Sequence, residues 1–268
     1  MKDRASYDLA FIDLDDTLLG PDKKISSENL EALDLLRGAG VEIVVASGRH
    51  HRNIASFTQI GKQGWILSSH GAVVRHEQTG EVIHRMTMDP VLMAEVSQRG
   101  RDRNMSLIAY HLDDAYIEGD TRWTQKYARE AGWQPRIVDF HGLAPDGFQK
   151  IIWSTEPKRI DEVAAGLIEE FRNRLYVVGT NPELLEFLAP AVNKAAGARA
   201  LANKLGVPFE RTLAFGDGHN DIEMLQWAGR SVAMAHGRER AREAAQFVSP
   251  AGPPETAFAR AVDLALRA

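Results

Sequence analysis

The chain has 268 residues, 44% of them hydrophobic, which is enough to build one large or two modest domains. Its 37 acidic and 32 basic residues give a formal net charge of −5, so it lacks the basic character of a nucleic-acid-binding protein. It contains no cysteine, which excludes disulfides, thiolate zinc sites and cysteine nucleophiles.

The first residues are charged and no long apolar stretch follows them. We therefore expect neither a signal peptide nor a membrane span, and we expect the protein to be cytoplasmic. We expect its partner to be a small molecule and expect neither a nucleic-acid nor a membrane partner. Nothing in the composition implies an obligate protein partner.

Strand-like and helix-like segments alternate from the N-terminus, a pattern typical of a parallel sheet covered by helices. The apolar run Leu9–Ile12 predicts a first strand, and Ser26 is a good N-cap for a helix that follows it. Val41–Ala46 and Trp65–Leu67 predict two further strands. Each of these strands ends in small or polar residues, and such carboxyl ends line the binding crevice of open α/β sheets.

The middle of the chain has a different pattern. Residues 73–77 and 81–84 flank a Gln-Thr-Gly turn and predict a hairpin. Strands then occur in runs between helices, as in an α+β module with an antiparallel sheet. We expect helices at 91–101, 123–131 and 158–172, and strands at 106–111, 115–118, 136–140, 148–154, 176–179 and 184–188.

The parallel-sheet pattern resumes with a helix at 198–205 and the strand Thr212–Phe215. The predicted fold class is therefore α/β, with a Rossmann-like parallel-sheet core and an inserted α+β cap domain. We place the core at residues 1–85 and 183–268 and the inserted cap at residues 86–182.

The first predicted strand is followed by Asp13-Leu14-Asp15-Asp16-Thr17. Asp13 and Asp15 are two residues apart, so on an extended chain their side chains point the same way. One carboxylate could attack a phosphoryl group while its neighbour handles protons. Attack by an anion on an anionic phosphate requires charge cancellation, and oxygen-only ligands suit Mg²⁺.

Other strand ends could complete such a site. Asp217 and Asp221 follow the strand at 212–215, and Ser47 with the following backbone amides could hold phosphate oxygens. Lys194 could neutralise both the phosphate and the nucleophile. Taken singly, these residues could be a solvated turn, a helix cap or a surface lysine; their occurrence together, each just past a strand, favours an active site.

Four segments together resemble the motifs of the haloacid dehalogenase superfamily, and more narrowly its Cof-type sugar-phosphatase-like branch. They are Asp13-Leu14-Asp15-Asp16-Thr17-Leu18-Leu19, Ser47-Gly48-Arg49, Asn193-Lys194 and Gly216-Asp217-Gly218-His219-Asn220-Asp221. The resemblance runs nearly end to end, and it implies a Rossmann-like core with a large cap inserted between the second and third motifs, which would supply substrate specificity.

By position, the resemblance implies that Asp13 is the nucleophile and Asp15 the general acid and then the base. It implies Mg²⁺ ligands from Asp13, the backbone carbonyl of Asp15, and Asp217, with Asp221 as a supporting ligand or outer partner. It also implies catalytic help from Lys194 and a set of phosphate contacts, namely Ser47, Gly48, Lys194 and Asn220. An acid at the position of Asp15 accompanies phosphatases and mutases of the superfamily.

The chain departs from the branch at three positions. Asp16 stands where glycine is commonest, His70 where asparagine is usual, and His236 within a replaced Gly-Asn-Ala segment. The two histidines border the pocket in relatives and could substitute for the hydrogen bonds of asparagine or have a distinct catalytic role. Together with Arg49, they are the candidate substrate contacts.

The leading hypothesis is a Mg²⁺-dependent phosphatase for a small phosphate monoester, such as a sugar phosphate or similar metabolite, that works through an aspartyl phosphate. A sugar phosphomutase with the same chemistry is the alternative. A receiver-like phosphoaspartate signalling domain is a third, which the large insertion and the late acidic pair disfavour. Polar and aromatic cap residues are candidates for specificity: Tyr110, His111, Glu118 and Trp123.

Overall fold

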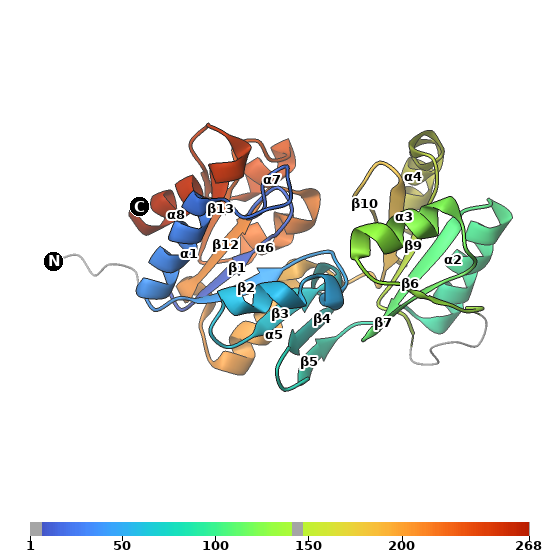
Figure 1. The fold of residues 1–268 in the computed structure, drawn as a ribbon, viewed down its shortest axis with the longest axis horizontal. Coiled ribbons are helices and arrows are strands. Elements are labelled where there is room, and N and C mark those ends of the chain that lie inside the picture. Colours follow the sequence, from blue (N-terminus) through green and yellow to red (C-terminus); the bar gives the residue numbers. More distant parts are fainter. Residues whose placement is uncertain (1–6, 141–146, 268) are drawn as a thin grey trace. The chain divides into compact units, whose positions relative to one another are not determined.

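The structure is a computed structural model that describes residues 7–140 and 147–267. Within these residues it forms two compact units (Figure 1). The first unit comprises residues 7–49, 54–84 and 193–267, and the second comprises residues 50–53, 85–140 and 147–192. The charged residues at the N-terminus, on which the expectation of no signal peptide partly rests, lie outside the described residues.

The first unit is built on an eight-stranded sheet whose central strands are parallel, as predicted. β3 and β4 pair antiparallel at one side, where the predicted hairpin adds β4 and β5. In spatial order the strands are β14 (Phe247–Val248), β13 (Arg230–Ala233), β12 (Thr212–Gly216), β1 (Leu9–Ile12), β2 (Glu42–Ala46), β3 (Trp65–Ser68), β4 (Val73–His76) and β5 (Val82–Arg85).

Helices cover both faces of this sheet, which explains why the central strands are continuous apolar runs (Figure 1). Because successive side chains point to opposite faces, Ala10 and Ile12 pack toward α1 (Ser27–Gly38) and α8 (Ala257–Arg267). Leu9 and Phe11 pack into a second core with the helices of the other face. Those helices are α5 (Lys194–Leu205), α6 (Ile222–Trp227) and α7 (Glu239–Ala244).

The second unit is an α+β module, as predicted. Its six-stranded sheet is antiparallel except between β7 and β8, and α2 and α4 cover the face that carries the larger core. In spatial order the strands are β10 (Tyr176–Gly179), β11 (Leu184–Leu188), β9 (Lys150–Ser154), β6 (Ser106–His111), β7 (Asp114–Ile117) and β8 (Arg136–Ile137). The helices are α2 (Pro90–Asp102), α3 (Arg122–Ala131) and α4 (Pro157–Phe171).

Short 3-10 turns complete the described chain. They are His51–Asn53, Ala55–Ile60, Ser69–Gly71, Phe209–Arg211, His219–Asp221 and Pro254–Thr256.

Several boundaries differ from the predictions; the strand predicted at 136–140 comprises only Arg136–Ile137, and the strand predicted at 148–154 begins at Lys150. β11 pairs with β9 and β10, so the second unit extends to Val192, beyond the cap end placed at residue 182. α5 begins at Lys194, four residues before the helix predicted at 198, because the Asn193 side chain accepts a hydrogen bond from the Ala196 amide and caps it.

None of the described helices is long and apolar enough to cross a membrane.

Candidate active site

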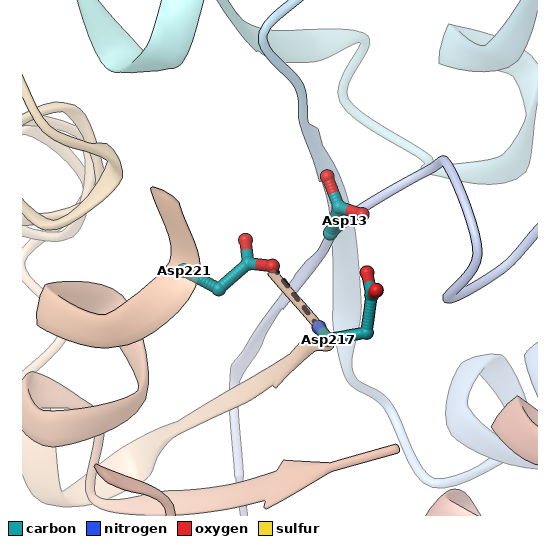
Figure 2. A group of neighbouring side chains, drawn as sticks. All are labelled: Asp13, Asp217 and Asp221. Atoms are coloured by element: carbon teal, nitrogen blue, oxygen red, sulfur yellow. Dashed lines mark hydrogen bonds between the residues drawn. The ribbon is translucent and has the colours of Figure 1, made fainter. Parts of the chain in front are cut away.

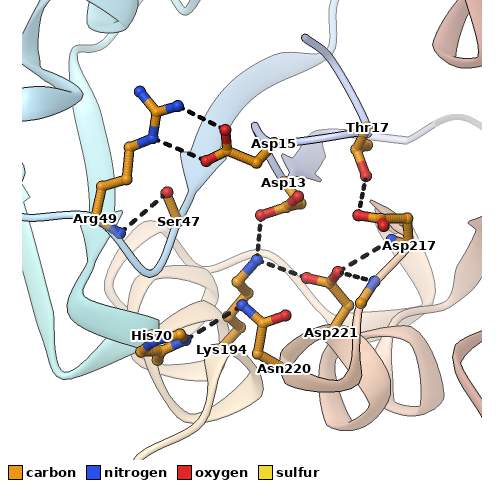
Figure 3. A network of polar contacts seen from close by, with 11 residues as sticks. Asp13, Asp15, Thr17, Ser47, Arg49, His70, Lys194, Asp217, Asn220 and Asp221 are labelled. Carbon is orange, nitrogen blue, oxygen red and sulfur yellow. Dashed lines mark hydrogen bonds and ion pairs between the residues drawn. The ribbon is translucent and has the colours of Figure 1, made fainter. Parts of the chain in front are cut away.

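Three neighbouring parallel strands bring the predicted acids and Ser47 to one edge of the first unit (Figure 3). Asp13 follows β1, Ser47 follows β2, and Asp217 follows β12. The Asp13 amide donates to the Phe215 carbonyl oxygen at 3.0 Å, which carries the ladder between β1 and β12 one residue past the strand. The chain therefore places both acidic motifs at the carboxyl end of the sheet, where α/β proteins bind ligands.

Asp13, Asp217 and Asp221 form a compact acidic cluster (Figure 2). One carboxylate oxygen from each lies within 4.8 Å of the others. Lys194 Nζ contacts Asp13 Oδ1 and lies 2.6 Å from Asp221 Oδ1, and the lysine side chain is fully buried. Four of the predicted site residues thus meet in one cluster with three carboxylates and one ammonium.

Burial and mutual repulsion perturb the acids of this cluster. Burial raises the pKa of Asp13 well above its ordinary value; Lys194 opposes the change, while Asp221 and Asp217 add to it. Burial, and then the charge of Asp221, raises the pKa of Asp217 to about 7. Burial alone would lower the pKa of Lys194, but Asp13 and Asp221 raise it instead. The lysine is therefore cationic, and the three carboxyl groups, when all are ionised, carry more negative charge than it cancels.

The position of Lys194 has a local cost that the acids offset. It is the first residue of α5, where the helix dipole favours anions and disfavours a cation. A buried ammonium at this position is tolerated because two carboxylates contact it. Helix propensity cannot explain a lysine here, whereas a role beside Asp13 does.

Asp221 is already bound through both of its oxygens. Oδ1 accepts from Lys194, and Oδ2 accepts from the backbone amides of Asp217 and Gly218 at 3.0 and 2.9 Å. Its carboxylate holds the turn after β12 and orients the lysine. Asp13 and Asp217 are consequently the better candidates for direct metal ligands, with Asp221 in the supporting position.

Asp15 points away from the acidic cluster and binds Arg49. The guanidinium makes two hydrogen bonds to the carboxylate, at 2.8 and 2.5 Å, and Lys23 Nζ lies 3.1 Å from Asp15 Oδ1. Burial opposes the change, yet the Arg49 guanidinium and Lys23 hold the pKa of Asp15 below its ordinary value. Asp15 is thus an ionised carboxylate in this structure, and its side chain is not a member of the three-carboxylate cluster.

Two of the other predicted phosphate-binding residues, Ser47 and Asn220, lie in the same polar network as Lys194 (Figure 3). Ser47 is buried, and its Oγ accepts from the Arg49 amide at 3.2 Å. Asn220 Nδ2 lies 3.2 Å from Nδ1 of the buried His70, whose ring in turn packs against Gly48. His70 therefore touches two of the residues expected to contact phosphate.

His236 is exposed and lies at the loop that follows Asp15. Its Nε2 is 2.7 Å from the Asp16 carbonyl oxygen, a contact that fixes this loop. Asp16 has a φ of 59°, a left-handed conformation that glycine adopts most easily and aspartate tolerates. This conformation accounts for an aspartate standing where the family commonly has glycine.

Sequence reasoning assigned no role to Thr17 or Lys23. Thr17 Oγ1 donates to Asp217 Oδ1 at 3.1 Å, and Lys23 forms an ion pair with Asp15. Thr17 belongs to the first motif, so its type could have signalled a hydrogen bond to a site acid. Lys23 is an ordinary lysine in a loop, and nothing in the sequence distinguishes it.

The candidate specificity residues of the second unit differ in their local contacts. Glu118 makes two hydrogen bonds with Arg101, at 2.8 and 2.7 Å, and accepts from the Phe140 amide at 2.7 Å, so it fastens α2 to the sheet. Tyr110 is buried and its hydroxyl accepts from Tyr127. His111 Nε2 lies 3.1 Å from Arg85 Nη2, and Trp123 lies under the Arg122 guanidinium.

The donor set suits a hard divalent cation. Asp13, Asp217 and Asp221 supply oxygen only, and carboxylates with room for water are the usual environment of Mg²⁺. A cation would also neutralise the charge that Lys194 leaves uncancelled and so reverse the raised pKa values of Asp13 and Asp217.

The chain belongs to the family of haloacid dehalogenase-like hydrolases, because the family's sequence model matches residues 10–253. This finding confirms the resemblance carried by the four motifs. It also agrees with the fold, a parallel-rich α/β core with an inserted cap.

Individual relatives support the same class. An HMP-PP phosphatase from Cronobacter sakazakii is 26% identical over 229 residues, which are 85% of this chain and 84% of that protein. The crystal structure of a haloacid dehalogenase-like hydrolase from Bacteroides thetaiotaomicron has a TM-score of 0.83 at 25% identity, covering 96% of this chain and 99% of that one. A subclass IIB sugar phosphatase shares the fold at a TM-score of 0.82 and 20% identity, covering 96% and 98% of the two chains.

Proposed function

We propose that this hydrolase is a Mg²⁺-dependent phosphatase that acts on a small phosphate monoester, such as a sugar phosphate or a similar metabolite. The observation that carries the proposal is the fully buried Lys194 between Asp13 and Asp221, with Asp217 beside them. It provides a carboxylate nucleophile, a fixed cation and a carboxylate pair that can hold a metal. The HMP-PP phosphatase relative supports a phosphate ester as the substrate class.

In the first step, a carboxylate oxygen of Asp13 attacks phosphorus as the ester P–O bond breaks, which leaves an aspartyl phosphate. The leaving oxygen takes a proton from Asp15. In the second step, water attacks phosphorus, Asp15 accepts its proton, and the Asp13–phosphate bond breaks to release inorganic phosphate. When bound, Mg²⁺ would be held by Asp13, the Asp15 backbone carbonyl and Asp217, and it would offset the charge of the phosphate oxygens.

The contacts of Asp15 fit the second step more directly than the first. With Arg49 and Lys23 against it, Asp15 is ionised, which is the form that accepts a proton from water. The first step needs the protonated form, so Arg49 has to leave the carboxylate when substrate enters. The released guanidinium could then bind the phosphate of the substrate, because a guanidinium can bind a phosphate, like a carboxylate, through two parallel hydrogen bonds.

Ser47, Gly48, Lys194 and Asn220 are the groups we assign to phosphate binding. Ser47 and Asn220 offer neutral donors, and Lys194 offers a charge that can serve the phosphate and Asp13 at once. We assign substrate selection to the second unit, whose exposed and half-buried polar side chains offer hydrogen bonds to the organic part of the ester.

The test is phosphate release from a panel of phosphate esters, with Mg²⁺ or with EDTA, for the wild type and for Asp13→Asn. We expect release that requires Mg²⁺ and falls roughly 10⁴-fold or more in the variant. Asp8→Asn is the matched control, since Asp8 pairs with Arg211 at the far end of β1. Metal-independent release, or an active Asp13→Asn, would contradict the proposal. Transfer of phosphate to a second hydroxyl in place of release would identify a mutase.

A further inference from the structure

A strained turn follows β3 and carries His70. Ser69, His70 and Gly71 have φ values of 50°, 59° and 87°, so three consecutive residues adopt left-handed backbone. This conformation is unfavourable for serine and histidine because their Cβ atoms crowd the backbone. A strained conformation persists only where surrounding contacts impose it, and such positions concentrate at functional sites.

The backbone of this turn is bonded to the second motif. The His70 amide donates to the Ser47 carbonyl oxygen at 3.0 Å, and the Ser69 amide donates to the Arg49 carbonyl oxygen at 2.9 Å. These two bonds fix the peptide group between Ser47 and Gly48 and the one that follows Arg49, so they hold the second motif on both sides. The turn therefore determines how the second motif presents its backbone to a ligand.

The same turn abuts the third motif. A Cβ on Gly71 would lie 2.5 Å from the Asn193 carbonyl oxygen and 3.0 Å from Lys194 Cα. Only glycine permits such close approach to the first residue of α5. The turn is thus packed against the helix end that places Lys194 beside Asp13.

The imidazole of His70 joins the second and fourth motifs. A Cβ on Gly48 would lie only 2.4 Å from His70 Cε1, so the ring covers Gly48. His70 is 1% exposed, and Nδ1 of its ring lies 3.2 Å from Asn220 Nδ2 (Figure 3).

This contact determines which end of the Asn220 amide faces the site. A primary amide has two N–H donors and one carbonyl acceptor. If an unprotonated Nδ1 accepts one N–H, the amide cannot flip without placing its carbonyl oxygen against a second acceptor. The other N–H then stays available to an anion, whereas a flipped amide would present an oxygen that repels phosphate.

We propose that His70 is a positioning residue for phosphate binding: it orients the Asn220 amide through Nδ1 and fixes the backbone around Gly48. It acts through these neighbours, so it is neither a catalytic acid nor a nucleophile. The inference rests on the proposed function, because it takes the anion that Asn220 binds to be the phosphate of substrate or product.

Three substitutions separate this role from simple packing. His70→Asn keeps an acceptor at the place of Nδ1, since the Oδ1 atom is equally far along the side chain, and asparagine tolerates left-handed backbone. His70→Gln places its polar atoms farther out, and His70→Phe keeps the ring without any acceptor. His84→Phe is the matched control, because His84 lies on β5 and has no contact with the acidic cluster among the described residues.

The measurement is the affinity for inorganic phosphate, by calorimetry with Mg²⁺ present, together with kcat and KM. We expect His70→Asn to bind within about threefold of wild type, and His70→Gln and His70→Phe to bind about tenfold more weakly or worse. Circular dichroism shows whether each variant is folded, and affinities are normalised to the folded fraction. Equal affinities for the Asn, Gln and Phe variants would overturn the proposal.

A double-mutant cycle with Asn220→Ala tests the connection between the two side chains. If His70 acts through Asn220, His70→Phe has little further effect on phosphate affinity once Asn220 is alanine. Full additivity would overturn that part of the proposal. The two proposals fail separately. A wild type that binds phosphate but releases none from any ester contradicts the phosphatase function. An active enzyme whose phosphate affinity is unchanged by His70→Phe contradicts only the role of His70.

Discussion

The two units each bury one lysine against carboxylates, with opposite consequences. Lys194 in the first unit contacts Asp13 and Asp221, and their attraction outweighs burial, so its pKa is raised. Lys150 in the second unit lies 2.6 Å from Glu186, and burial prevails over that attraction, so its pKa is lowered. Both side chains are at most 2% exposed. The opposite pKa shifts of the two lysines therefore follow from the number of carboxylates in contact, two for Lys194 and one for Lys150, and not from a difference in burial.

The surplus of charge distinguishes a site from a structural pair. Glu186 joins β11 to Lys150 on β9 and also accepts from Thr180 Oγ1 at 2.6 Å, so this pair fixes the register of two strands. The cluster around Lys194 joins β1, α5 and the turn after β12, and its three carboxyl groups, when all are ionised, exceed the charge of the one lysine. A surplus of this kind destabilises the ligand-free fold and is relieved by a cation, which is the arrangement a metal-dependent site requires.

The largest effect, a loss of activity, is expected from replacing Lys194. Lys194→Met should lower kcat for phosphate release roughly 10³-fold or more, because Asp13 loses the cation that lowers its pKa and orients its carboxylate. Lys204→Met, which removes an exposed lysine paired with Glu81, is the control and should leave kcat unchanged. A Lys194→Met enzyme within tenfold of wild type would mean that the lysine does not serve the reacting carboxylate.

Replacing Lys150 should lower the stability of the folded protein. Lys150→Met leaves Glu186, which is 4% exposed, as a buried charge without its ammonium partner, and we expect a loss of about 3 kcal/mol in the free energy of unfolding in urea. The double variant Lys150→Met, Glu186→Leu should recover most of that loss, because an apolar pair of similar volume needs no desolvation of charge. A double variant as unstable as the single one would contradict this account.

The surplus charge of the first unit should also appear as a pH dependence without metal. Burial and Asp221 raise the pKa of Asp217 to about 7, so the folded state binds this proton more tightly than the unfolded chain does. The resulting stability is complete below the ordinary carboxyl pKa and is lost as the pH rises through 7. In EDTA, we expect Asp217→Asn to gain about 2 kcal/mol over wild type between pH 5 and pH 8. Saturating Mg²⁺ should remove most of that difference in stability. If the difference between Asp217→Asn and wild type does not change with pH, Asp217 is not the group whose pKa is raised.

Most of the fold was predictable because it follows from local patterns. The apolar runs of β1 and β2 and the N-cap at Ser26 are readable one residue at a time. β13 was not predicted, because two of its four residues, Arg230 and Ser231, are polar. The assignment of β11 to the second sheet was not predicted either, because the partner of a strand depends on contacts distant in sequence.

The site could be predicted as far as motifs define it. Three of the predicted acids, Asp13, Asp217 and Asp221, meet around Lys194 as the order of motifs suggested. The pairing of Asp15 with Arg49, and the role of His70 between Gly48 and Asn220, could not be read from the sequence. Side-chain direction beyond a strand end depends on turn geometry, and the left-handed backbone of His70 gives no signal in a histidine.

A pH effect of similar size and opposite sign is expected in the second unit, at His50, which lies near Lys150. Burial first, and then the charge of His51, lowers the pKa of His50 to about 3, with Lys150 adding to the shift. The unfolded chain takes up a proton near pH 6.5, whereas the folded protein resists it. The stability that this group provides is therefore complete above pH 6.5 and is lost as the pH falls toward 3, opposite in sign to that of Asp217.

Between pH 7 and pH 5, His50 should account for about 2 kcal/mol of lost stability. Urea unfolding of wild type and of His50→Gln at the two pH values measures this loss of stability, since the variant lacks the titrating group. Its stability relative to wild type should rise by that amount on going to pH 5. His76→Gln, which replaces a half-buried histidine of β4, is the matched control. If both variants follow the same pH profile, His50 is not the group that resists protonation, and the acid sensitivity of the second unit has another source.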